Sequence, residues 1–499
     1  MLAPHEVPSA STAGGHLTPA GQYPRGQSSQ RIRKPGMLVV HANRRILQSQ
    51  RSRVAALTFV LYLATLSSDA IRKVAALPAS LLGIIYVITA LIYIIFIPGT
   101  AGRKRKTPRM LPIWLFMLSL WCLAVALVQH IPLEMALLGW TSYVFFVPLL
   151  YVGAELAADD RLAVKALRVA VISGGVVGVG AIASAFLGQS APALLQPIIP
   201  AVGIHSSSMG DIYLSPSIFA DAEEASEQLL IALFAWAALA HLANGGLRRT
   251  PSAFLGVLVA SGLIVTARRA DIYVAIAGII AVLVQGCIWA PSSARNLAGR
   301  IAAQARRRLG VAVFLAVAGS LTLVFFLGET KLASFLTSGS PGSRISVMFS
   351  LPNSGSLMGQ GTGTSTQGVT VVGATPLTGR LPQGSYGSYV LGGRTFIITE
   401  GGLAKTWLEL GVMGVVLYGA VFWAALAPAI RSLHRLDGAG IALAMLVIAL
   451  GVIFLKGHQS LDDPLIQPLF WLSVGGIWGR MRSVAVSGGE TRSRVAIVS

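Results

Sequence analysis

Charged residues and cysteines are both scarce in this chain of 499 residues. Only 12% of the residues are charged, about half the share found in soluble globular domains, so the composition excludes that class. The two cysteines, Cys122 and Cys287, lie inside apolar runs, which argues against a disulfide framework or a cysteine-based metal cluster. Residues 1–53 lack the apolar core and cleavage site of a secretory signal, so we expect a disordered, basic, cytoplasmic tail there.

Apolar residues make up most of the remaining sequence. They account for 54% of the chain and give a mean hydropathy of +0.70, which is typical of a polytopic membrane protein. A helix needs roughly 20 apolar residues to cross the hydrocarbon core, and about 12 segments approach this length. They are 54–71, 78–98, 110–128, 135–154, 167–188, 224–243, 252–267, 271–290, 311–328, 402–427, 440–456 and 464–480. We therefore predict an all-α polytopic membrane protein, with a membrane domain at 54–480 and a cytoplasmic tail at 481–499.

The basic residues predict how the helices are oriented. Lys and Arg outnumber Asp and Glu by 39 to 19, and roughly three in four basic residues flank the apolar segments on one side, which marks that side as cytoplasmic. This placement predicts cytoplasmic N- and C-termini, and it explains the net charge of +20 without a nucleic-acid partner. Two long segments then lie outside, at 189–223 and at 329–401, the second between the ninth and tenth predicted helices. Alternation around Val390 indicates that this second segment is partly ordered.

Two adjacent arginines, Arg268 and Arg269, lie in the sequence TARRAD on the outer side, which is otherwise poor in positive charge. The structural interpretation is that they reach lipid headgroups or balance a neighbouring carboxylate. The functional interpretation is an anion site, because a guanidinium stays charged and its planar fork of donors matches phosphate oxygens. The long loop adds Arg344, Arg380 and Arg394. Together these arginines predict an outward basic cluster suited to a lipid pyrophosphate.

Acidic residues gather at two places on the same side. Glu223 and Glu224 open the sixth predicted helix, where the structural interpretation is helix capping. Glu400 and Glu409 lie at the start of the tenth predicted helix, and Glu409 lies deep enough to require a polar partner. The sequence GQGTGTSTQG at 359–368 lacks the GK[ST] ending of a nucleotide-binding loop, so we expect its glycines to allow tight turns instead.

Three stretches, in this order, resemble the bacterial O-antigen ligase and polymerase superfamily of integral membrane glycosyltransferases. IVTARRADIYVAIAGIIAVL is similar to the family's hairpin with an arginine, and Arg269 aligns best with that arginine. GSRISVMFSL followed by LMGQGTG is similar to the loop pattern of Gly-x-Arg and Gly-x-Gly, which places Arg344 on the loop arginine. EGGLAKTWLELGVMG resembles the pattern that begins with His or Glu and ends with E-x-G-x-x-G. Glu400 stands first in this pattern, where many ligases have His, which favours a polymerase.

The resemblance implies metal-independent glycosyl transfer, without a cofactor, at the periplasmic face of the bacterial inner (plasma) membrane. A glycan on undecaprenyl pyrophosphate is the implied donor, and a sugar hydroxyl of a lipid-linked repeat unit is the acceptor. Arg269 and Arg344, with Arg268 and Arg394 as second candidates, would stabilise the departing pyrophosphate. Glu400 is the first candidate to accept the hydroxyl proton, with Asp211, Glu223 and Glu224 as alternatives. The further candidates for binding pyrophosphate or glycan are Arg268, Arg394, Arg380, Asp211, Glu223 and Glu224.

Two alternatives to a polymerase stay open. A ligase would join a finished glycan to a lipid or protein acceptor. A transporter would use its outer arginines only to recognise an anionic cargo, and it should show interrupted spans with ionisable residues at the bilayer midplane. The expected partners are the lipid-linked oligosaccharide, membrane lipid and a chain-length regulator, with no nucleic acid.

Overall fold

The computed structural model describes thirteen stretches of the chain, all within one compact unit, Gln50–Ser499. They are 110–187, 205–207, 210–212, 217, 222–242, 250–266, 268–288, 356–365, 375–376, 385–399, 402–431, 436–456 and 466–498. The predicted N-terminal tail and the predicted helices at 54–71, 78–98 and 311–328 lie outside the described residues.

Every predicted apolar segment that falls within these stretches is helical. The helices are α4 (Met110–Val128), α5 (Leu133–Trp140), α6 (Leu149–Ala158), α7 (Asp160–Leu187), α8 (Ala222–Leu242), α9 (Thr250–Val265), α10 (Arg269–Ile288), α13 (Gly402–Arg431), α14 (Gly438–Lys456) and α15 (Gln467–Val498). In the described part of the chain, four helical stretches are long and apolar enough to cross a membrane: Met110–Val128, Leu133–Ala158, Asp160–Phe186 and Gly402–Arg431. The total of about 12 transmembrane helices remains a prediction.

The predicted helix at 135–154 is not one regular helix. It is divided into α5, a π-helical turn η2 (Thr141–Phe145) and α6, whose N-cap is Pro148. Proline is tolerated there because the first N–H groups of a helix have no partner within it. The side-chain amide of Gln467 donates to the carbonyl oxygen of Ser142 inside the π-turn. Turns of this kind are frequent at functional sites, and here the turn carries Tyr143, whose side chain is buried.

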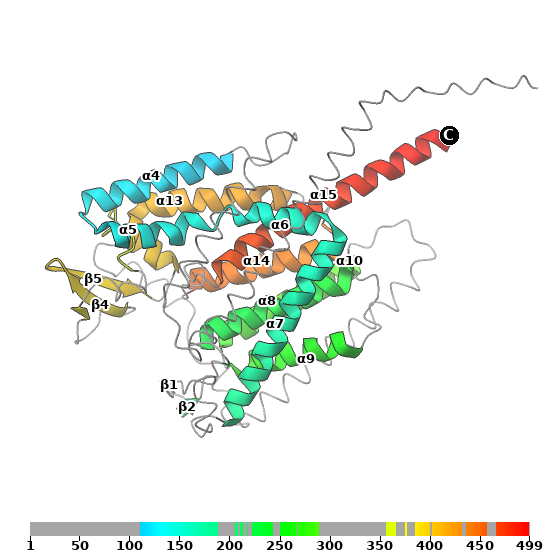
Figure 1. Ribbon diagram of the computed structural model, residues 1–499, viewed down its shortest axis with the longest axis horizontal. Helices are drawn as coiled ribbons and strands as arrows, with labels where there is room; N and C mark the ends of the chain where they lie inside the picture. The colour runs from blue at the N-terminus through cyan, green and yellow to red at the C-terminus, as the bar shows by residue number, and fades with distance from the viewer. Residues whose placement is uncertain are drawn as a thin grey trace, which may run out of the picture. The chain divides into compact units, whose positions relative to one another are not determined.

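The helices pack in pairs that are distant in the sequence. Helix α4 runs beside α13, and α6 packs along α15 (Figure 1). Helix α7 contacts α8 and α9, while α14 contacts α8, α10 and α15. A single apolar cluster runs through these contacts and includes Trp471, Phe234 and Leu150. The helices therefore share one core, and the polar residues described below lie within it or at its ends.

Helices α6 and α15 approach so closely that no side chain fits between them at two glycines. A Cβ atom on Gly475 would lie 1.8 Å from the carbonyl oxygen of Leu150, and one on Gly153 would lie 2.0 Å from that of Leu472. Small residues allow membrane helices to approach in this way. We expect Gly475→Ala to push the helices apart and lower the melting temperature in detergent, at a cost of about 1–3 kcal/mol. Gly451→Ala is the matched control, because no atom lies within 4 Å of its new Cβ; equal melting temperatures would contradict the close packing.

The long segment predicted outside the membrane contains a small sheet. Strands β3 (Thr375–Pro376), β4 (Ser385–Leu391) and β5 (Arg394–Thr399) are antiparallel in the order β3-β4-β5. This confirms the expectation of partial order around Val390. Within the other predicted outer segment, β1 (His205–Ser207) pairs with β2 (Gly210–Ile212). Strand β5 ends at Thr399, and α13 begins at Gly402, so the sheet is joined almost directly to that helix.

A buried guanidinium in the interior of α15 joins the starts of α7 and α14, at positions that the charge pattern assigns to the cytoplasmic side. Arg480 of α15 is 5% exposed and forms ion pairs with Asp437, just before α14, and with Asp160, the first residue of α7. Its Nη1 also donates to the carbonyl oxygen of Ala157, at 3.3 Å. A buried guanidinium needs such partners to offset its lost hydration. The contact agrees with the prediction that Arg480, Asp437 and Asp160 lie on one side.

Candidate functional site

The connection between α9 and α10 contacts the start of α8. Helix α9 ends at Val265 and α10 begins at Arg269, so Arg268 lies in a tight connection, as the sequence predicts. Its guanidinium forms an ion pair with Glu223 in the first turn of α8. Close by in the chain, the hydroxyl of Ser226 donates to the carboxylate of Asp271. Two predicted site residues from separate segments, Arg268 and Glu223, therefore meet.

The contact between Arg268 and Glu223 fits helix capping by Glu223 and Glu224, and it also fits the predicted role of these residues in binding substrate. Glu223 and Glu224 lie in the first turn of α8, where the helix dipole favours negative charge. Glu227 and Asp271 are buried, at 1% and 4% exposure. Among the described residues, no group of three or more His, Cys, Asp and Glu side chains is arranged to hold a metal ion. The guanidinium of Arg268 therefore lies at the start of α8, where several carboxylates are grouped.

The other predicted site residues fall in different places. Arg344, Arg380 and Glu400 lie outside the described residues. Arg269 is the first residue of α10, and Asp211 lies in β2, opposite Ser206; the side chains of Arg269 and Asp211 are not among those the structure describes.

Arg394 is held by the protein itself, at the exposed end of the hairpin formed by β4 and β5. Its Nη1 donates to the carbonyl oxygen of Gln129 at 2.8 Å, and its Nη2 donates to the side-chain oxygen of Gln129 at 2.9 Å. The guanidinium also lies over the ring of Phe396, with 5.5 Å from Cζ to the centroid. These contacts give Arg394 a role in docking the hairpin onto the end of α4.

A second polar region surrounds a break in α13. Gly411 has φ 69° and ψ −168°, which is not helical, so the backbone groups on either side lose their partners within the helix. Other segments replace them. The carbonyl oxygens of Leu408 and Glu409 accept from the backbone N–H groups of Gln360 and Gly361, at 2.6 and 3.2 Å. The indole N–H of Trp121 donates to the carbonyl oxygen of Leu410 at 2.9 Å.

The segment that fills this break is the Gly-rich stretch that the sequence singles out. Residues 359–365, here called the buried loop, are all buried. Gly359, Gly361 and Gly363 have positive φ, which confirms the expectation of tight turns. The hydroxyl of Thr362 donates to the carbonyl oxygen of Cys122 on α4, at 2.7 Å. The loop is therefore packed between α4 and the break in α13.

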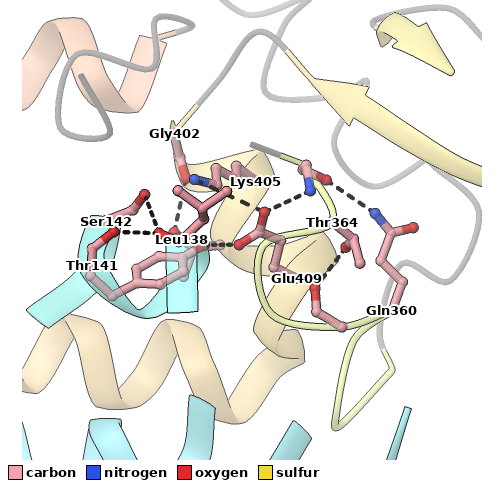
Figure 2. Close-up of polar contacts among 12 residues, drawn as sticks. Leu138, Thr141, Ser142, Gln360, Thr364, Gly402, Lys405 and Glu409 are labelled. Carbon is pink, nitrogen blue, oxygen red and sulfur yellow. Dashed lines mark hydrogen bonds and ion pairs between the residues drawn. The ribbon is translucent and has the colours of Figure 1, made fainter. Parts of the chain in front are cut away.

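Glu409 has polar partners from three segments of the chain (Figure 2). The hydroxyl of Tyr143 donates to its Oε2 at 2.9 Å, and the backbone N–H of Ser365 donates to its Oε1 at 2.6 Å. The ammonium of Lys405, one helical turn earlier, lies 3.9 Å from Oε1. Both Lys405 and Glu409 are 0% exposed. The prediction that Glu409 needs a partner is confirmed, and these four residues are called the Glu409 cluster below.

The buried loop is also bonded to the sheet. The hydroxyl of Ser365 donates to the carbonyl oxygen of Ile397 on β5 at 2.8 Å. The hydroxyl of Tyr389 on β4 donates to the backbone carbonyl oxygen of Thr364 at 2.6 Å. Burial, and after it the negative charge of Glu409, raises the pKa of Tyr389 above its ordinary value. The hydroxyl therefore stays a neutral donor. Gln129 adds a bond from its side-chain amide to the carbonyl oxygen of Gly359, at 2.9 Å.

Several residues of this region could not be identified from the sequence. Tyr143, Ser365 and Gln129 carry no local signal, because their partners lie hundreds of residues away or in an irregular loop. Lys405 did carry a signal, since a lysine four residues before Glu409 faces the same side of a helix. Comparisons of this chain with models of protein families, with curated proteins and with solved structures found no match.

Proposed function

We propose that this protein is a polymerase of undecaprenyl-pyrophosphate-linked polysaccharide repeat units, acting at the periplasmic face of the inner membrane. The hydroxyl oxygen of the acceptor sugar bonds to the anomeric carbon of the donor glycan. The bond from that carbon to the pyrophosphate oxygen breaks, and its electron pair leaves with undecaprenyl pyrophosphate. Arg269 and Arg344 stabilise the charge that develops there, and Glu400 accepts the hydroxyl proton and passes it to solvent.

The observation that carries this proposal is that LMGQGTG and LELGVMG, which belong to two of the stretches that resemble the superfamily, dock onto each other. LMGQGTG supplies the backbone N–H groups of Gln360 and Gly361, and LELGVMG supplies the carbonyl oxygens that accept from them. The side chain of Glu409 also accepts from the N–H of Ser365, two residues after LMGQGTG. Stretches that belong to one catalytic face should be neighbours in space, and these two are.

The sidedness of the contacts gives further support. Arg268 and Glu223 come from segments that the charge pattern assigns to the outer side, and so do Arg394 and Gln129. Arg480, Asp437 and Asp160 come from segments assigned to the inner side. Each of these four contacts thus joins segments with the same assignment. A basic site for pyrophosphate on the outer side is consistent with this grouping.

One observation favours a transporter as the second candidate. Helix α13 is interrupted at Gly411, and an ion pair between Lys405 and Glu409 lies buried beside the interruption; interrupted helices with ionisable residues are typical of carriers. In a carrier, however, the free backbone groups of the break bind the cargo. Here the carbonyl oxygens of Leu408, Glu409 and Leu410 accept from the buried loop and from Trp121. The break is occupied by the protein, so we retain the polymerase.

Polymerisation can be tested with the purified full-length protein in nanodiscs. Its substrate would be undecaprenyl-pyrophosphate-linked repeat units isolated from cells that lack this protein, incubated with EDTA present. We expect a ladder of lengthening products on a gel, because each transfer adds one repeat unit. Boiled protein is the control. A single shift on a second acceptor would indicate a ligase instead, and the absence of any covalent product would favour a carrier.

A further inference from the structure

We propose that Glu409 is a positioning residue, which fixes the buried loop against α13 and, through Ser365, sets the position of the strand that leads to Glu400. This inference rests on the proposed function for its link to catalysis. Its structural part concerns only the contacts of the Glu409 cluster and can be tested without any assay of activity.

The carboxylate of Glu409 is enclosed by protein. Oε2 accepts from the hydroxyl of Tyr143 and Oε1 accepts from the N–H of Ser365, while the side chain has no exposed surface. A group that takes a proton from a substrate hydroxyl must come within hydrogen-bond reach of it. Glu409 is not accessible to a substrate in this arrangement, so its contribution must act through other residues.

The charge of Glu409 makes its contacts strong. Hydrogen bonds to an ionised group are shorter and roughly twice as strong as bonds between neutral groups. The ammonium of Lys405 lies 3.9 Å from Oε1 and 5.3 Å from the centroid of the Tyr143 ring. A buried carboxylate is stable only when such a partner offsets its lost hydration. The ammonium of Lys405 therefore offsets part of the cost of burying the carboxylate that holds Ser365.

Two hydrogen bonds of Ser365 connect Glu409 to Ile397, two residues before the end of β5. The N–H of Ser365 donates to Glu409, and the hydroxyl of the same serine donates to the carbonyl oxygen of Ile397. The side-chain amide of Gln360 donates to that hydroxyl at 3.0 Å. Strand β5 ends at Thr399, the residue before Glu400, and Thr399 is buried. Ser365 is thus bonded both to the carboxylate and to the strand that precedes the proposed proton acceptor.

The first test is Glu409→Gln, which keeps the shape of the side chain and removes its charge. We expect amide hydrogen exchange in residues 359–365 to become about tenfold faster, because neutral hydrogen bonds are weaker. We expect kcat to fall about 10- to 100-fold, as small misplacements of a catalytic group do, with KM changed by less than about twofold. Glu134→Gln is the control, since Glu134 is an exposed carboxylate in the first turn of α5.

The pH profile separates positioning from proton transfer. If Glu409 only positions, Glu409→Gln keeps the acidic limb of the plot of kcat against pH, and Glu400→Gln removes it. Loss of that limb in Glu409→Gln would overturn the proposal, because Glu409 would then be the titrating group. Exchange in 359–365 at the wild-type rate would overturn it equally, because the loop would not depend on the carboxylate.

A second variant cuts the path beyond Glu409 and covers the case in which Glu409→Gln does not fold. Ser365→Ala keeps the N–H that bonds to Glu409 but removes the hydroxyl that bonds to Ile397. We expect faster exchange in β5 and a lower kcat, with little change in melting temperature. Ser473→Ala is the matched control, because its buried hydroxyl donates within α15, to the carbonyl oxygen of Leu469. Wild-type exchange in β5 of Ser365→Ala would contradict the path.

Failure of this inference is distinguishable from failure of the proposed function. If the wild-type protein makes no polymer, the polymerase assignment is wrong, and the exchange rates alone decide whether Glu409 holds the loop. If the wild-type protein makes polymer and exchange in 359–365 is unchanged in Glu409→Gln, the polymerase assignment stands and the positioning role is wrong.

Discussion

Alanine in place of Gly411 is expected to prevent the native arrangement of α13 and to remove activity with it. The backbone of Gly411 has φ 69° and ψ −168°, a region open almost only to glycine. A Cβ atom there would lie 2.4 Å from the carbonyl oxygen of Leu357 and 2.5 Å from that of Ser356. Backbone strain and overpacking together would cost about 2–6 kcal/mol. That is a large part of the stability of an ordinary domain.

The matched control for Gly411→Ala lies on the same helix. At Gly419 an added Cβ would meet no side chain or neighbouring segment of the described structure within 4 Å, and alanine favours a helix over glycine by about 0.5–1 kcal/mol. Gly419→Ala should therefore be as stable as the wild type or slightly more stable. Thermal unfolding in detergent, followed by size-exclusion chromatography, measures both variants. A melting temperature of Gly411→Ala equal to that of Gly419→Ala would show that the break in α13 is not required.

Arg344→Ala is expected to lower the rate of polymer formation by about 100- to 1000-fold without loss of folded protein, as removal of one donor to a developing oxyanion does. Arg344 lies outside the described residues. It precedes the buried loop in the sequence, in the stretch GSRISVMFSL that resembles the loop pattern with an arginine. Arg344→Lys should give an intermediate rate, because lysine keeps the charge but lacks the planar fork that matches two phosphate oxygens.

A different arginine provides the control for Arg344→Ala. Arg431 is exposed at the end of α13, on the side assigned to the cytoplasm, and Arg431→Ala should leave the product ladder unchanged. Chain lengths and initial rates are read from the same gels. Wild-type chain lengths in a folded Arg344→Ala protein would remove this arginine from the site.

Helix positions could be predicted because they depend on local composition. The apolar run at 110–128 coincides with α4, and the start of α13 at Gly402 was also expected. In a membrane, a run of apolar residues must satisfy its own backbone groups, so length and hydropathy together predict a helix. The tight connection that carries Arg268 follows from two such runs separated by a few polar residues.

The irregular parts of the same helices could not be predicted in this way. The π-turn at 141–145 and the break at Gly411 leave backbone groups without helical partners. Such irregularities are stable only because other segments supply the missing bonds, Gln467 at the π-turn and the buried loop at the break. Nothing in a local window indicates that these partners will arrive.

Composition and hydropathy were enough to predict a helical protein built of apolar segments and to predict that Glu409 would need a partner. The tertiary structure was needed to show that Tyr143 and Ser365 are partners of Glu409 and that Arg394 is held by Gln129. Hydropathy is a property of neighbours along the chain. A buried carboxylate also accepts hydrogen bonds from whichever donors the packing brings within about 3 Å, and Tyr143 and Ser365 come from segments distant in the sequence.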